Sequence, residues 1–185
     1  MFERAKEMAE RLTRRDGARR RAHELYVAIA EAARRPVFYT ELEVPDTVEG
    51  RYEMLSLHMV LVLRRLKDDP AETEIFSQLL FDVMFRDVDD TLREMGVGDL
   101  RVGKKVRSYA EAFFGRVLAY EKAFAGEESL EAALSRNVYE TRDHPRAADL
   151  ARYVEAADRS LRAVDVNTML SGEVRFPEPR PAVAE

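Results

Sequence analysis

The sequence predicts an all-α fold, a single-domain helical bundle of about six to seven helices. The first reason is composition, because 46 % of the 185 residues are hydrophobic and 35 % are charged, with only 8 Gly and 7 Pro. A chain rich in helix formers and poor in turn formers favours helices. The second reason is periodicity, since apolar residues recur at steps of three and four along successive segments that end at Gly or Pro.

The N-terminal part is predicted to contain two helices and an extended connection. The first helix covers about residues 2–14, and the Asp16-Gly17 pair is expected to end it. A second helix then continues to Pro36, which cannot lie in a helix interior. Residues 36–46 contain two prolines, each of which biases the preceding residue away from the helical region, so an extended segment is predicted.

The central part is predicted to hold three longer helices. Asp46 or Thr47 caps the first of them, which carries a heptad-like apolar seam at Val48, Tyr52, Leu55, Met59, Val62 and Leu66. The next helix starts with Asp69 as its cap and ends at Gly96, a residue suited to a left-handed stop. After an elbow over residues 96–101, the third helix runs to Phe124. Its internal Gly115 costs about 1 kcal/mol relative to alanine, which a close helix crossing would explain.

The C-terminal part is predicted to contain a short helix over about residues 130–138 and a last one after Pro145. The segment that ends the chain, F-P-E-P-R-P-A-V-A-E, cannot form a helix. The expected organisation is a basic amphipathic N-terminal helix in residues 1–16, a helical domain in residues 17–166 and a mostly disordered tail in residues 167–185.

Composition also excludes several classes of function. There is no cysteine, so disulfides, thiolate catalysis and cysteine-ligated metals are excluded. The three histidines, His23, His58 and His144, are far apart, and no metal or cofactor is predicted. His58, inside an apolar stretch, is expected to be a hydrogen-bonded core residue. The net charge of −5 gives no reason to expect DNA binding, and no signal peptide or membrane-spanning stretch is evident. A soluble protein of a reducing, cytoplasmic compartment is predicted.

A phosphate-binding signal in the elbow is misleading. Gly98, Gly103 and Lys104 have the spacing of a P-loop. That motif requires Ser or Thr next, where this chain has Lys105, and a β-strand before it, where a helix is predicted. The glycines are therefore interpreted as a reversal between two helices, and no enzymatic activity is predicted.

The helix before the elbow carries both acidic and aromatic residues. Its carboxylates are not arranged as a close pair, so most are interpreted as a solvated face, and Asp87 is the one expected to have an interior partner. Phe81 and Phe85 lie one turn apart, and two interpretations stay open for them: core packing, or the lining of a groove for a partner.

Two basic clusters complete the set of candidate binding residues. Residues 11–21 hold six arginines against one acid, which suits anionic lipid, RNA phosphate or simple solvation; the six are Arg11, Arg14, Arg15, Arg19, Arg20 and Arg21. A second cluster, Arg101, Lys104, Lys105 and Arg107, begins the helix after the elbow, where the helix dipole disfavours cations. An acidic neighbour such as Asp99 or Glu94 is expected to compensate it.

Several segments of the chain carry a family resemblance: Leu57-His58-Met59 through Arg64-Arg65, Phe81 to Arg93, Glu94 to Asp99, Val102-Gly103-Lys104-Lys105, Phe113-Phe114-Gly115-Arg116 and Tyr120, and more weakly residues 130–161. Through these segments about two-thirds of the chain resembles the ubiquinol–cytochrome c chaperone family. The resemblance implies a helical, non-enzymatic assembly chaperone that binds newly made cytochrome b and assists biogenesis of the ubiquinol–cytochrome c reductase (bc1) complex. The chain departs from mitochondrial members in lacking a targeting presequence and tryptophan, which indicates a bacterial member.

These observations give one hypothesis and one alternative. The hypothesis is a chaperone peripheral to the cytoplasmic face of the inner membrane. Its client surface is expected to include Phe81, Phe85, Asp87, Asp99, Lys104, Lys105, Phe114, Arg116 and Tyr120. The six N-terminal arginines are expected to contact the membrane or the ribosome. The alternative is an RNA- or ribosome-binding adaptor that uses the same arginines.

Overall fold

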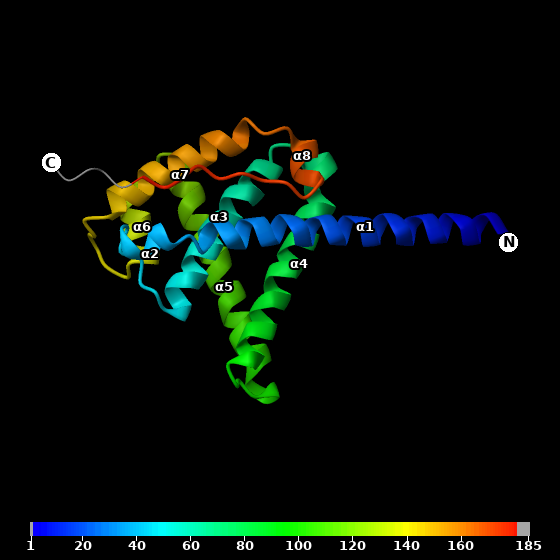
Figure 1. The fold of residues 1–185 in the computed structure, drawn as a ribbon, viewed down its shortest axis with the longest axis horizontal. Coiled ribbons are helices and arrows are strands. Elements are labelled where there is room, and N and C mark those ends of the chain that lie inside the picture. Colours follow the sequence, from blue (N-terminus) through cyan, green and yellow to red (C-terminus); the bar gives the residue numbers. More distant parts are fainter. Residues whose placement is uncertain (1, 181–185) are drawn as a thin grey trace.

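The computed structural model describes residues 2–180, and the side chains of residues 16–180. Over this range the all-α prediction is confirmed. The helices are α1 (Phe2–Ala33), α2 (Pro36–Thr40), α3 (Val48–Leu66), α4 (Pro70–Glu94), α5 (Asp99–Phe124), α6 (Leu130–Val138), α7 (Ala147–Arg162) and α8 (Val166–Leu170). Figure 1 shows α1 as a long rod that crosses the other helices, with its N-terminal end projecting to one side.

Helix α3 is the centre of the bundle. Residues 52–62 are all buried, and α3 contacts α1, α4, α5, α6 and α7. This agrees with a sequence that places apolar residues on more than one face of the helix. Of the two predicted caps, Thr47 is the one used, since its side-chain hydroxyl accepts a hydrogen bond of 3.0 Å from the Gly50 amide.

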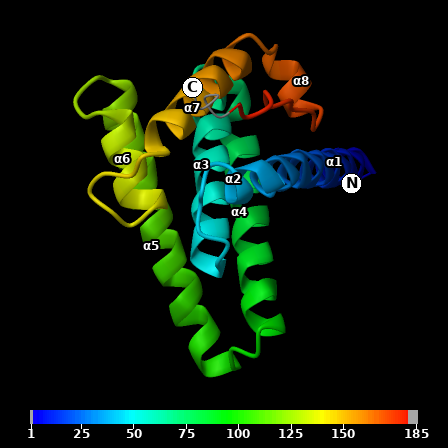
Figure 2. The same cartoon turned by 60° about the vertical axis from the view of Figure 1, so that its left-hand side comes forward.

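Helices α4 and α5 form a long antiparallel hairpin whose free end projects from the body (Figures 1 and 2). Gly96 ends the first arm with a φ of 82°, the left-handed stop that the sequence predicts. Helix α5 begins at Asp99, earlier than predicted, so the connection is shorter than the 96–101 elbow. A helix precedes the Gly98–Lys104 segment, which confirms a chain reversal instead of a P-loop.

Three sequence-based expectations about glycine and proline are wrong. Helix α1 continues through Gly17, because flanking arginine and alanine residues favour helix enough to offset a cost of about 1 kcal/mol. The 36–46 segment is not wholly extended, because Pro36 takes the first position of α2, where its missing amide hydrogen costs nothing. Gly115 marks no close helix crossing, since a Cβ there would have no heavy atom within 4 Å.

The C-terminal segment differs from the expected disorder over residues 167–180. Arg21 Nε donates to the Leu170 carbonyl at 2.9 Å, and an Arg35 nitrogen donates to the Pro177 carbonyl at 2.7 Å. Phe176 is buried, with its ring centroid 4.9 Å from that of His58. Arg21 of α1 and Arg35, which precedes α2, thus supply hydrogen-bond donors to carbonyl groups of a segment without regular structure. Residues 181–185 lie outside the described part of the chain.

His58 is a hydrogen-bonded core residue, as predicted. It is fully buried on α3, with Nδ1 2.7 Å from the Met54 carbonyl oxygen and Nε2 2.7 Å from the Tyr153 hydroxyl oxygen. A carbonyl can only accept, so Nδ1 carries a proton. Burial lowers the pKa of His58 to about 4, so the imidazole is neutral near pH 7 and Nε2 accepts from Tyr153.

This buried histidine makes stability depend on pH. Because the folded pKa of about 4 lies below the ordinary 6.5, the unfolded state binds more protons between these values. Protonation linked to His58 should therefore lower the free energy of unfolding by ~3 kcal/mol in total as pH falls from 6.5 to 4. Urea unfolding of the protein and of His58→Gln at several pH values measures it. We expect the difference in free energy of unfolding between the protein and His58→Gln to change between pH 6.5 and pH 4. Identical pH dependence of the two proteins would contradict the lowered pKa of His58.

Candidate functional site

An aromatic groove lies between α3, α4 and α5. It has a volume of about 500 Å³, and the apolar side chains that line it include Val60, Leu63, Phe81, Phe113, Phe114 and Val117. Phe81 stacks on Phe114 with ring centroids 5.5 Å apart, and both lie near the buried ring of Phe113. Phe114 is 54 % exposed although it belongs to this stack. An accessible aromatic side chain therefore forms one wall of the groove.

The rim of the aromatic groove is closed at one end by an ion-pair network. Arg64 donates to Glu121 at 2.6 Å and to Asp158 at 3.1 Å, and its guanidinium lies 4.3 Å from the centre of the Phe124 ring. Charged groups there are engaged with one another. One turn beyond Phe114 on α5, Leu118 is 65 % exposed. Exposed Lys67, Glu74 and Gln78 also line the groove, but its Phe114 side continues into the apolar Leu118. This side suits an apolar segment of another chain.

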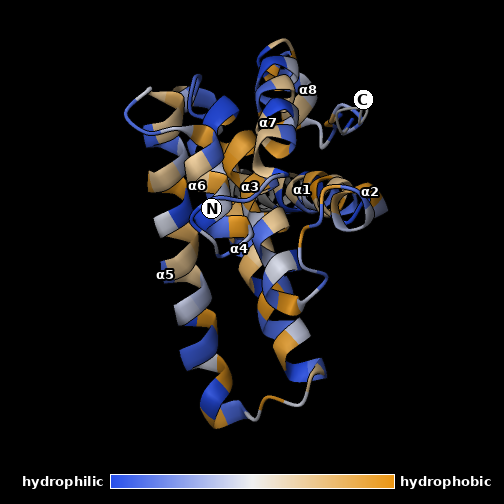
Figure 3. Cartoon of the chain, turned by 90° about the vertical axis from the view of Figure 1, so that its left-hand side faces the viewer, coloured by the Kyte–Doolittle hydropathy of each residue, from blue (hydrophilic) through white to orange (hydrophobic). Residues whose placement is uncertain are grey.

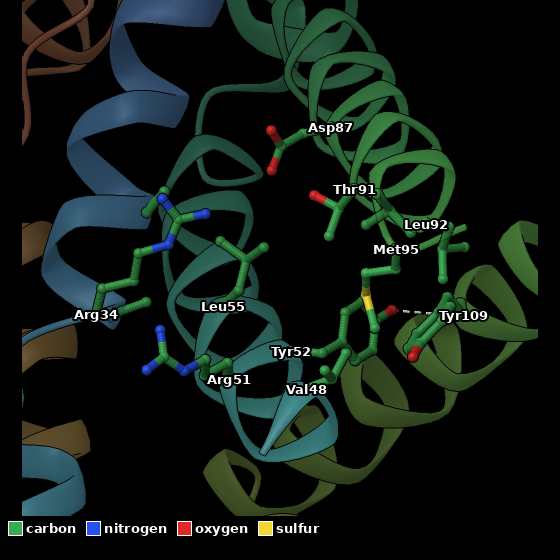
Figure 4. Close-up of a pocket in the computed structure, with 13 residues that line it drawn as sticks. Arg34, Val48, Arg51, Tyr52, Leu55, Asp87, Thr91, Leu92, Met95 and Tyr109 are labelled. Atoms are coloured by element: carbon green, nitrogen blue, oxygen red, sulfur yellow. Dashed lines mark hydrogen bonds between the residues drawn. The ribbon is translucent and has the colours of Figure 1, made fainter. Parts of the chain in front are cut away.

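A second groove, here called the tyrosine groove, lies nearer the C-terminal end of α4 than the aromatic groove (Figure 4). It has a volume of about 340 Å³ between α1, α3, α4 and α5. Tyr52 donates to the Tyr109 carbonyl at 2.5 Å across its floor. Figure 4 shows Arg34 and Arg51 on one side of the groove and Asp87 on the other. This groove is also largely apolar, with charge confined to its edge.

The predicted aromatic residues come together, but the predicted surface as a whole does not. Phe81, Phe85 and Phe114 form one cluster with Phe113. Lys104 and Lys105 are exposed near the free end of the hairpin, about 15 Å along α5 from Phe114 by helix rise. The sequence places Lys104 only ten residues before Phe114, but ten residues of a straight helix are long enough to separate the two side chains.

Two of the predicted acidic residues are held by partners within the chain. Asp87 lies at the tyrosine groove and accepts a 2.6 Å hydrogen bond from the Tyr26 hydroxyl, which confirms the expected interior partner. Burial and this carboxylate raise the pKa of Tyr26. Asp99 is exposed and paired with Arg93. Neither carboxylate adjoins the aromatic cluster.

Two further predicted residues serve the fold. Arg116 forms a bidentate ion pair with the buried Glu53, at 2.9 and 2.6 Å. Tyr120 is 1 % exposed, so a direct contact between its side chain and a client is excluded in this conformation. Both side chains lie on the side of α5 that faces α3. The sequence does not reveal which side of α5 this is, because aromatic and basic residues are mixed along the helix.

The N-terminal arginines do not act as one exposed set. Arg19 and Arg20 are exposed and make long ion pairs of 3.8 and 3.5 Å with Asp16 and Glu24. Arg21 is engaged with α8. The side chains of Arg11, Arg14 and Arg15 lie outside the described residues.

Several groove residues were missed from sequence. Phe113, Val117 and Leu118 line or extend the aromatic groove, and Tyr52 and Tyr109 form the floor of the tyrosine groove. A signal existed for Leu118, because it follows Phe114 by four residues and shares its helix face. No helix over residues 2–180 combines the length and apolar character needed to cross a membrane.

Known proteins resemble this chain over most of its length. A protein-family model described as ubiquinol–cytochrome C chaperone matches residues 40–176. The crystal structure of the Cbp3 homolog from Brucella abortus superposes with a TM-score of 0.80 and 35 % sequence identity, covering 92 % of this chain and 97 % of that one.

Curated relatives are more distant in sequence. The ubiquinol–cytochrome-c reductase complex assembly factor 1 of Xenopus laevis is 26 % identical, over 81 % of this chain and 77 % of its own length. The Mus musculus protein of that name is 25 % identical over 82 % of this chain. This chain spans about half of that relative, 53 % of its length. The match to the family model covers well over half of the chain, and the chain therefore belongs to the ubiquinol–cytochrome c chaperone family.

Proposed function

We propose that this protein is an assembly chaperone for the ubiquinol–cytochrome c reductase (bc1) complex, and that it binds newly made cytochrome b through the aromatic groove. The family and the names of its relatives support the assembly role. The observation that carries the site is Phe114, which is 54 % exposed while it stacks on Phe81 at an apolar groove of about 500 Å³. Such a surface gains most by covering an apolar segment of another protein.

The chemistry of the groove fits binding without catalysis. Its apolar walls offer area for a client helix or loop, and the ion-paired Arg64, Glu121 and Asp158 bound one end. The alternative of an RNA- or ribosome-binding adaptor is not favoured, because Arg21 is engaged within the chain and the relatives are named as assembly factors. The proposed place of action is the membrane surface at which cytochrome b is inserted.

Client capture tests this proposal directly. A tagged protein is isolated from cells and the recovered cytochrome b is quantified. Phe114→Asp should reduce recovery by roughly tenfold or more, because a carboxylate replaces an apolar contact. Phe114 is more than half exposed, so the fold should survive, which circular dichroism checks.

A matched control separates the groove from general surface effects. Val27→Asp introduces the same charge at an exposed apolar position of α1 that lines neither groove, and it should retain full recovery. Full recovery with Phe114→Asp would place the client elsewhere. Loss of the protein should also remove the bc1 complex while other respiratory complexes persist; an unchanged bc1 level would contradict the assembly role.

A further inference from the structure

The free end of the α4–α5 hairpin exposes apolar side chains that the fold does not use. Leu100 is 100 % exposed and Met95 is 54 % exposed. The hairpin carries both away from the body (Figures 1 and 2), and Figure 3 shows hydrophobic and hydrophilic ribbon side by side at this end. Residues 95–107 are called the hairpin tip below. A fully exposed leucine at a projecting point contributes nothing to the core.

The tip also carries cations that have no partner within residues 16–180. Arg101, Lys104, Lys105 and Arg107 are exposed, and within residues 16–180 none of their side chains makes an ion pair or hydrogen bond. The acidic neighbours expected from the sequence do not compensate these cations, because Asp99 pairs with Arg93 and, within residues 16–180, Glu94 makes no ion pair with any of them. Four cations in the first turns of a helix oppose its dipole. Their charge is available to an external anion.

The order of these residues along α5 matches the profile of a lipid interface. Leu100, Lys104 and Arg107 are spaced by four and three residues and share the outer face of the helix. The two cations follow the leucine by about 6 and 10 Å along the axis. Apolar groups of an interfacial element enter about 5–10 Å below the headgroups while its cations stay at the phosphates. Exposed Asp90 and Glu94 lie on the other arm, so the α5 side of the tip is the more basic one.

We propose that the hairpin tip docks on the surface of a bilayer that contains anionic phospholipids, with Leu100 entering the interface and the four cations at the phosphates. Charge complementarity identifies this occupant, and the projecting tip fits a flat surface better than a concave protein site. Single-stranded nucleic acid would instead require exposed aromatic side chains for base stacking. The inference goes beyond client binding and does not require cytochrome b.

Vesicle sedimentation tests the charge requirement. The protein should sediment with phosphatidylcholine vesicles that contain phosphatidylglycerol, and not with phosphatidylcholine alone. Lys104→Glu combined with Lys105→Glu should weaken binding by roughly tenfold or more. Arg142→Glu combined with Arg175→Glu makes the same charge change at two exposed arginines outside the hairpin and should leave binding unchanged. All four side chains are exposed, so both variants should fold.

Fluorescence tests the orientation. The chain contains no tryptophan, so a single substitution reports one position. Emission of Leu100→Trp should shift to the blue when anionic vesicles are added, whereas Leu118→Trp, an exposed position on the body half of α5, should not shift.

Three outcomes would overturn the proposal. The first is failure of the protein to sediment with anionic vesicles. The second is loss of binding in the Arg142→Glu/Arg175→Glu control together with retention of binding in the Lys104→Glu/Lys105→Glu variant. The third is retention of the protein by single-stranded RNA with no vesicle binding, which would make the tip a nucleic-acid contact. Because these assays contain no client, they can fail while cytochrome b recovery succeeds, and the reverse.

Discussion

Gly50→Ala is expected to lower the free energy of unfolding by about 3 kcal/mol or more. A Cβ at this position would lie 2.0 Å from the Pro45 carbonyl oxygen and 3.0 Å from the Pro45 carbonyl carbon. Both are backbone atoms, so no change of rotamer can relieve the contact. The Gly50 amide also donates to Thr47, and moving the backbone would break this helix cap. The strain therefore falls on the start of the central helix.

Urea unfolding measures this effect against a matched control. Gly115→Ala makes the same chemical change on α5, where no heavy atom lies within 4 Å, and should raise stability by up to ~1 kcal/mol through helix propensity. The two substitutions should thus have opposite signs. A small effect of Gly50→Ala would mean that the segment around Pro45 relaxes freely, contrary to its tight packing on α3.

The second large effect is expected at the Glu53–Arg116 pair. Glu53 is buried on α3, and Arg116 of α5 is its bidentate partner, at 2.9 and 2.6 Å. Burial raises the pKa of Glu53, and the ion pair with Arg116 opposes that rise. Arg116→Met would leave a buried carboxylate without its partner, at a cost of about 3 kcal/mol.

The pH dependence of stability and a double variant test this prediction. Without Arg116 the folded-state pKa of Glu53 should rise further, so the folded state binds a proton more readily than the unfolded state. Stability of Arg116→Met should therefore recover as pH falls below neutral. The double variant Glu53→Leu with Arg116→Met removes both charges and should be much closer to the original protein in urea unfolding. Additive losses in the double variant would show that the pair contributes through packing alone.

Much of the fold could be predicted because the long helices carry strong local signals. The seam on α3, the left-handed stop at Gly96 and the start of α4 after Asp69 each depend on residues close in sequence. The predictions that failed depend on neighbouring residues or distant contacts that outweigh the local sequence pattern. Gly17 lies within a helix that its neighbours favour, and the C-terminal segment is fixed by donors from Arg21 and Arg35, more than 140 residues away.

The candidate site could be predicted in part for the same reason. Phe81 and Phe85 can be placed together from sequence because they lie one turn apart on α4, whereas the stacking of Phe114 on Phe81 joins two helices and is visible only in the structure. Which side of α5 faces α3 depends on tertiary packing. Arg116 and Tyr120 lie on that side and therefore point into the interior, which the sequence does not show. The distance between the aromatic cluster and Lys104 follows only from the straight course of α5.

The buried state of α3 has a consequence for how the protein is made. Helix α3 ends at Leu66, and the last long helix that covers it, α7, begins at Ala147, about 80 residues later. At synthesis rates of about 5–20 residues per second, the apolar surface of α3 waits roughly 4–16 s for that cover. During this interval a nascent chain presents the kind of surface that promotes aggregation, and α1, which is already made, and the amphipathic α4 and α5, which are made next, cover part of it.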